Sequence, residues 1–164
     1  MYTCRSRSLP RIQSDLLGAS LLGVEDLLLV TGSPLSSVAE KKPILPDLEI
    51  DSIGAVNLTS RLNHGEDVGG NPIGQPTSFH IGIHIDPTAY DMERELSRLR
   101  WKLDAGAEFA LTAPIFDVTA LQQLLSHIDQ DRLPVIATIW PIRSAQEAEF
   151  FEERLASVSV PEPL

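Results

Sequence analysis

Two titratable side chains, His84 and Asp86, stand at the end of an alternating apolar stretch, FHIGIHI, which covers residues 79–85. Residues two apart on a strand share a face, so this spacing places an imidazole beside a carboxylate. Such a pair suits proton transfer near neutral pH, because histidine titrates there. It equally suits an ion pair at the surface, which is the more common use of this spacing, and both interpretations stay open.

The remaining histidines show no pattern of a metal site. His64, His80 and His127 fall in a loop, a strand and a helix, without the spacing that metal ligands need. Cys4 is the single cysteine, which excludes an internal disulfide and a cysteine-based zinc site. We therefore predict no metal site.

Composition excludes several classes of partner. The chain has 164 residues and a net charge of −10, which argues against nucleic acid or an anionic membrane as a partner. No stretch is long and apolar enough to span a bilayer, and the basic start lacks the apolar centre of a signal peptide. The length suits one domain, residues 1–164. We expect a cytoplasmic protein.

Apolar runs that end in turn residues predict four strands, near 27–31, 79–85, 108–112 and 134–139. Helical spacing predicts helices over 13–22, 51–63, 92–103, 118–128 and 144–155, and residues 64–78 are typical of a loop. A helix followed by four strand–helix units predicts an α/β fold with a parallel sheet. Four strands make a small open sheet or part of a barrel, and we favour the barrel, which needs roughly 250 residues when complete.

The carboxyl ends of parallel strands share one edge of a sheet, where ligands usually bind. In GAEFALTAPIFD, residues 106–117, that end of the strand carries Ala113, which has no group for hydrogen bonding or acid–base chemistry. No GxGxxG follows the first predicted strand, and GxxxxGK[ST] is absent from the sequence. The usual nucleotide-binding loops are therefore not indicated.

Several stretches together resemble the methylenetetrahydrofolate reductase family. They are TCRSRSLPRIQSDLLGASLLGVEDLLLVTGSP, DSIGAVNLTSRLNHGEDVGGNPIGQPTSF, LRWKLDAGAEFALTAPIFD and LPVIATIWPI. The chain is most similar to the reductase half of bacterial bifunctional proteins that also carry a homocysteine S-methyltransferase. The resemblance implies a (β/α)8 TIM barrel, present here as a partial barrel with four parallel strand–helix units, about strands four to seven.

The resemblance also implies a cofactor and a reaction. In this family NAD(P)H reduces a bound FAD, which reduces 5,10-methylenetetrahydrofolate to 5-methyltetrahydrofolate. By position, Thr31 and Gly32 match a turn along the flavin, and Asp51 and Ser52 match a helix start whose N–H groups face phosphate. The other positions that match cofactor contacts, on the adenosine, ribose and diphosphate side, are Asp86, Glu95, Arg98 and Lys102. The remaining charges between Glu93 and Lys102 are typical of a solvated helix face.

Two positions depart from the family pattern. Ser33 stands where the family has an aspartate beside the flavin, and Ala113 stands where it has a glutamine that binds the pterin. The resemblance also places the family's general acid on a strand before Met1. These differences predict impaired catalysis, with no catalytic residue intact. The alternative hypothesis is a truncated, non-catalytic remnant or assembly module, which pairs with the missing barrel half or forms a homo-oligomer.

Overall fold

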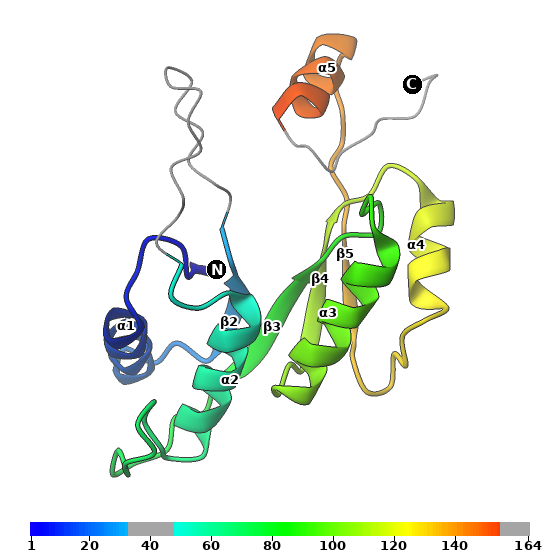
Figure 1. Cartoon of the computed structure of the whole chain (residues 1–164). Coiled ribbons are helices and arrows are strands. Elements are labelled where there is room, and N and C mark those ends of the chain that lie inside the picture. Colours follow the sequence, from blue (N-terminus) through cyan, green and yellow to red (C-terminus); the bar gives the residue numbers. More distant parts are fainter. Residues whose placement is uncertain (33–47, 155–164) are drawn as a thin grey trace.

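The computed structural model describes residues 1–32 and 48–154, with side chains up to Glu149. Strands and helices alternate along this part of the chain (Figure 1). They are β1 (Tyr2–Thr3), α1 (Leu9–Leu21), β2 (Asp26–Val30), α2 (Ser52–Asn63), β3 (His80–Ile85), α3 (Met92–Asp104), β4 (Phe109–Pro114), α4 (Val118–Leu125), β5 (Val135–Thr138) and α5 (Ala145–Arg154).

The described strands form one parallel sheet in the order β1-β2-β3-β4-β5. Sequential parallel strands joined by helices are the arrangement of a TIM barrel, here a partial one. The α/β class and the parallel sheet are therefore confirmed, as are strands at the four predicted places, each within about two residues, an ordinary boundary error. The loop at 64–78 has one isolated bridge, between Glu66 and Pro72.

The prediction that four strands form the sheet and that a helix comes first was wrong. Tyr2 and Thr3 pair with Leu29 and Val30, so a strand precedes α1. The backbone N–H of Cys4 extends the pairing by donating to the carbonyl of Val30 at 3.1 Å. A two-residue strand has no periodicity of its own, and only pairing with β2 defines it.

Side chains fix the beginnings of the helices. Asp51, Asp91 and Asp117 each accept hydrogen bonds from backbone N–H groups in the first turns of α2, α3 and α4. Residues 144–147, before and within the first turn of α5, form part of a capping box: the Ser144 hydroxyl accepts from the Glu147 N–H at 3.2 Å. The Glu147 carboxylate, however, accepts from the N–H of Arg143 at 2.8 Å.

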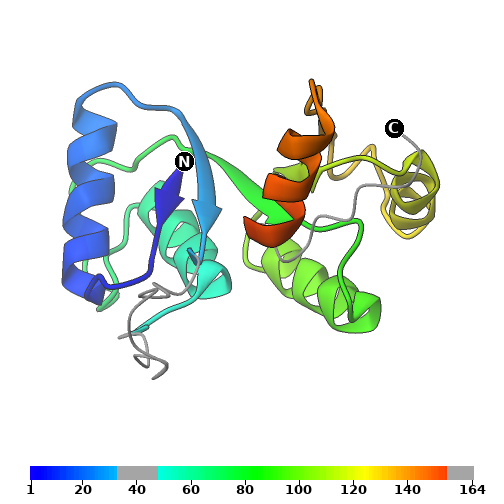
Figure 2. The same cartoon turned by 90° about the horizontal axis from the view of Figure 1, so that it is seen from above.

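The two faces of the sheet differ in burial. The face toward the helices is packed, and its fully or nearly buried side chains include Leu27, Leu29, Ile81, Ile83, Ile85 and Ala110. Figures 1 and 2 show α1, α2, α3 and α4 following one another along the sheet, whereas α5 stands beyond the ends of β4 and β5. On the opposite face the apolar side chains are only half-buried or exposed, among them Leu28, Val30, Phe109, Leu111 and Ile136.

Candidate functional site

A cavity of about 500 Å³ opens where β1, β2 and β3 end. This volume lies in the usual range of small-molecule sites, about 300–1,000 Å³. Its lining brings together most of the residues singled out from the sequence, namely Thr31, Gly32, Ser52, Asp86, Glu95, Arg98 and Lys102. Met1, Thr3, Leu29, Val30 and His84 complete it. Residues far apart in the chain thus share one concave surface because the strands are parallel.

The turn after β2 lies close against side chains at the end of β1. Gly32 has a φ of +90°, and a Cβ there would meet the Arg5 and Thr3 side chains at 3.3 and 3.5 Å. Glycine is the residue that tolerates both conditions. The Arg5 Nε donates to the Gly32 carbonyl at 2.9 Å, which ties this turn to the end of β1.

The beginning of α2 is saturated with hydrogen bonds from within the protein. The Ser52 N–H donates to the Thr31 hydroxyl at 3.0 Å. The N–H groups of Ile53 and Gly54 donate to the Asp51 carboxylate at 3.0 and 3.1 Å. These three N–H groups therefore already have acceptors, and the geometry here does not offer them to a phosphate.

Asp51 and Arg98 connect α2 to α3. The Arg98 Nη2 donates to the second Asp51 carboxylate oxygen at 2.8 Å, and both side chains are largely shielded from solvent. Burial alone would raise the pKa of Asp51, but the hydrogen bond from Arg98 and those from the α2 backbone lower it on balance. The Arg98 side chain thus lines the cavity while one of its nitrogens is held by Asp51.

Lys102 is the most buried charge in the cavity. Its exposed fraction is 5%, and its Nζ donates to the His84 carbonyl at 2.8 Å. Burial lowers the pKa of Lys102, Arg98 lowers it further, and Glu95 and Asp51 act in the opposite direction. Lys102 thus differs from the solvated charges expected elsewhere on α3, because tertiary packing covers it. Lysine is almost never buried to this extent without a partner.

The acidic side of the cavity comes from Asp86 and Glu95. The Glu95 carboxylate accepts from the Asp86 backbone N–H at 3.2 Å, which closes the turn between β3 and α3. The Asp86 carboxylate accepts from Thr88 at 2.9 Å. Among the described residues, His84 and Asp86 form no ion pair with each other. The interpretation of His84 and Asp86 as an ion pair at the surface was therefore wrong, although both residues line the cavity.

The two positions that depart from the family pattern have different outcomes. Ser33 lies outside the described residues. Ala113 lies on β4, has an exposed fraction of 2% and is not part of the cavity lining.

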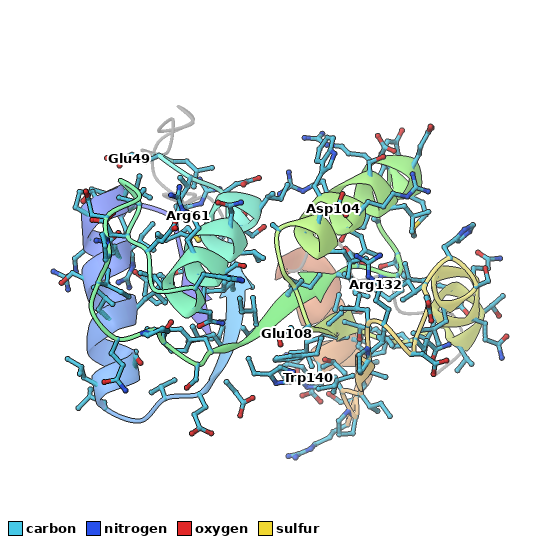
Figure 3. All side chains as sticks on the ribbon, turned by 90° about the horizontal axis from the view of Figure 1, so that it is seen from below. Glu49, Arg61, Asp104, Glu108, Arg132 and Trp140 are labelled. Carbon is cyan, nitrogen blue, oxygen red and sulfur yellow. The ribbon has the colours of Figure 1, made fainter. Side chains whose placement is uncertain are left out.

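A second cavity, of about 510 Å³, lies beyond β4 and β5, where residues 140–145 and Ala148 face Ile115 and Phe116. Trp140, labelled in Figure 3, contributes to it.

Sequence reasoning missed the contribution of β1. Thr3 and Met1 line the cavity because β1 lies at the edge of the sheet, beside β2. The signal in the sequence that could point to them is indirect. Gly32 indicates that another part of the chain approaches the turn closely, but the sequence does not identify that part.

No helix in the described part of the chain is long and apolar enough to cross a membrane. Over the same residues there is no cluster of three or more side chains suited to a metal ion.

Comparison with models of protein families matches residues 1–164, the whole chain, to the family described as methylenetetrahydrofolate reductase. No curated protein matches the chain.

Proposed function

Since this chain belongs to the methylenetetrahydrofolate reductase family, we propose that it binds FAD in the cavity at the ends of β1, β2 and β3. We propose further that it serves the reduction of 5,10-methylenetetrahydrofolate by NAD(P)H, and that within the family it belongs with the reductase halves of bifunctional enzymes that also carry a homocysteine S-methyltransferase.

The observation that carries this proposal is Lys102. An ammonium group on a residue with an exposed fraction of 5% is costly to bury, and within the described part of the chain its hydrogen-bond partner is one backbone carbonyl, at 2.8 Å. The cavity that it lines also receives Arg98. Lys102 and Arg98 line this cavity together with the half-buried apolar residue Val30, which suits a ligand that joins an anionic part to an apolar part.

Different residues of the chain would bind different parts of FAD. Lys102 and Arg98 would neutralise the diphosphate, and Glu95 would accept hydrogen bonds from ribose hydroxyl groups. Gly32 would let the backbone lie against the flavin ring, because no Cβ intervenes. The bound flavin would supply the hydride transfer, and the protein would supply position and charge.

A second candidate function is a non-catalytic binding or assembly module. It is favoured by Ala113, which is buried and lacks the amide that the family uses for the pterin. Binding of FAD and turnover of folate are therefore separate properties of this chain. A module of this kind would keep the first and lack the second.

The test separates these steps. The purified protein is titrated with FAD and followed by flavin fluorescence and visible absorbance, then mixed anaerobically with NADH or NADPH, and finally with the folate. Bleaching of the flavin followed by its reoxidation by the folate supports the reductase. Binding without reoxidation supports the module. Lys102→Met, a substitution of similar length without charge, should weaken FAD binding at least tenfold, as loss of a hydrogen bond to a charged group does. Unchanged binding in Lys102→Met would contradict the proposed site.

A further inference from the structure

The His84 imidazole faces the cavity without a partner among the described residues. His84 stands near the end of β3, is half-buried and lines the cavity. Over residues 1–32 and 48–154, neither of its ring nitrogens has a hydrogen bond; the residue contributes only its carbonyl, to Lys102. Among the described residues, the Arg5 Nη1 is the buried side-chain polar atom without a partner, so the His84 ring nitrogens are open to the cavity. An imidazole with free ring nitrogens at the wall of a cavity is available to a ligand that enters it.

Both positive and negative side chains surround the His84 ring, and they differ in how closely they contact His84. The charged residues that line the cavity are Lys102, Arg98 and Glu95 from α3 and Asp86 after β3. Asp51, before α2, contacts the cavity residue Arg98. Glu95 already accepts from the Asp86 backbone, and Asp86 accepts from Thr88. Lys102, at the carbonyl of His84 itself, is the nearest of these charges by contact. Lys102 and His84 line the same cavity, and the charge of Lys102 acts on the His84 ring, so an anion in this cavity can meet both.

The protonation state of the ring follows from the same surroundings. Burial, and then the positive charge of Lys102, lower the pKa of His84, while Asp86 and Glu95 act in the opposite direction. The ring is thus neutral at neutral pH in the free protein. An anion placed between Lys102 and the ring would offset the charge of Lys102 and favour the imidazolium.

We propose that His84 contacts the phosphate-bearing part of the ligand and takes up a proton from solvent when that ligand enters the cavity. The ligand class is a diphosphate diester of the dinucleotide type. The inference rests on the proposed function where the ligand is FAD. It adds a contact residue and a proton linkage that the family match does not contain.

The experiment compares three probes at about pH 6 and about pH 8, on either side of the usual histidine pKa. FAD carries both parts of the ligand, ADP-ribose carries the diphosphate diester without the flavin, and riboflavin carries the flavin without phosphate. None of the diphosphate diesters titrates in this interval, so a pH dependence belongs to the protein. FAD and ADP-ribose should bind more tightly at the lower pH, by up to about tenfold per pH unit for one proton. Riboflavin should show no such dependence.

The variant His84→Gln keeps a hydrogen-bonding side chain but cannot take up a proton. It should bind FAD with the same affinity at both pH values, and at about pH 6 about tenfold or more weakly than the unchanged chain, the effect of losing a charged hydrogen bond. His127→Gln is the matched control, because His127 is exposed after α4 and outside this cavity. It should retain the full pH dependence. Circular dichroism checks that both variants fold, and NMR of the His84 ring should show its pKa rise when ADP-ribose is added.

The outcomes separate this inference from the proposed function. FAD binding that does not depend on pH overturns the role of His84 and leaves the flavoprotein proposal standing. Proton-coupled binding of ADP-ribose without FAD binding supports the role of His84 and contradicts the flavoprotein proposal. Riboflavin binding with the same pH dependence places His84 at the ring and overturns the inference. Absence of binding by all three probes overturns both.

Discussion

At the scale of single residues, Gly82 on β3 has no room for a side chain. A Cβ on Gly82 would lie 2.2 Å from the Phe109 ring, which covers it from the neighbouring strand. The same ring packs against the His80 ring at a tilt, with centroids 4.7 Å apart. We predict that Gly82→Ala destabilises the fold by about 1–3 kcal/mol, because the ring must leave its place. Chemical denaturation measures this loss.

The matched control is Gly18→Ala. Gly18 lies within α1, and a Cβ added there would have no neighbouring atom within 4 Å. Alanine at this position should stabilise the protein by about 0.5–1 kcal/mol, because it restricts the unfolded chain and favours the helix. Equal effects of the two substitutions would contradict the packing of Phe109 on Gly82.

Ala113 gives a second prediction at this scale. Its exposed fraction is 2%, so neighbouring atoms cover its methyl group. Ala113→Gln should therefore cost about 1–3 kcal/mol of stability through overpacking and should not produce folate turnover. Ala137→Gln, on the exposed part of β5, is the control and should be nearly neutral. Thermal unfolding measures the change in stability, and a folate reductase assay measures turnover. Turnover in Ala113→Gln would show that the missing amide alone limits catalysis.

At the scale of elements, the Asp51–Arg98 pair links α2 to α3. Because the pKa of Asp51 is lowered in the folded protein, its charge stabilises the fold above the ordinary carboxyl pKa of about 4 and is lost as the pH falls through the lowered value. Asp51→Asn keeps the helix cap but removes the charge. We predict a loss of about 1–2 kcal/mol at neutral pH that shrinks as the pH falls below about 4. Urea unfolding across this pH range measures it.

Asp117→Asn provides the comparison, since Asp117 caps α4 by accepting from Thr119 and its side chain is exposed. It should have little effect at any pH, because asparagine caps helices about as well as aspartate. A loss in Asp51→Asn that does not change with pH would show that the ion pair adds nothing to the cap.

Besides its pairing with β2, β1 is held by a carboxylate of α1. Asp15 accepts from the Tyr2 hydroxyl at 2.9 Å, from Arg7 at 2.6 Å and from Arg11 at 2.7 Å. Cys4, next to β1, is fully buried, and burial raises the pKa of its thiol to about 11. We predict that Asp15→Ala loosens β1 and speeds modification of Cys4 by a thiol reagent severalfold, because the thiolate becomes accessible.

Asp104→Ala is the control for this substitution, because Asp104 lies at the exposed end of α3. It should leave the rate of Cys4 modification unchanged. An equal rate in both variants would contradict the role of Asp15.

At the scale of the whole molecule, the face of the sheet opposite the helices remains partly open. Ile136 and Ile139 are 52% and 80% exposed, and Trp140 is 45% exposed, all along or just beyond the edge strand β5. Edge strands and exposed apolar groups favour association. We predict that the isolated chain forms dimers or larger species as its concentration rises, which size-exclusion chromatography with light scattering would detect.

Ile136→Lys should shift this equilibrium toward the monomer, because a charge on an edge strand opposes pairing. Val118→Lys is the control, since Val118 is 64% exposed but lies on α4. A chain that stays monomeric at every concentration tested would contradict the prediction.

Local sequence determined the strands and helices that have patterns of their own. The apolar runs of β2, β3, β4 and β5 and the capping aspartates act through neighbours a few residues away, so they can be recognised without the fold. The resemblance to the family, carried over position by position, brought Glu95, Arg98 and Lys102 on α3 into consideration. Ala113 could be recognised as chemically inert from its residue type alone.

Only the tertiary structure decided what depends on distant partners. β1 exists because β2 offers it hydrogen bonds, and a two-residue segment carries no signal of that. Lys102 is buried and Arg98 is paired with Asp51 because α2 and β3 pack against α3, which helical periodicity does not encode. His84 lines the cavity for the same reason. Burial and pairing are properties of the surroundings of a side chain, and in this protein those surroundings come from residues far away in the sequence.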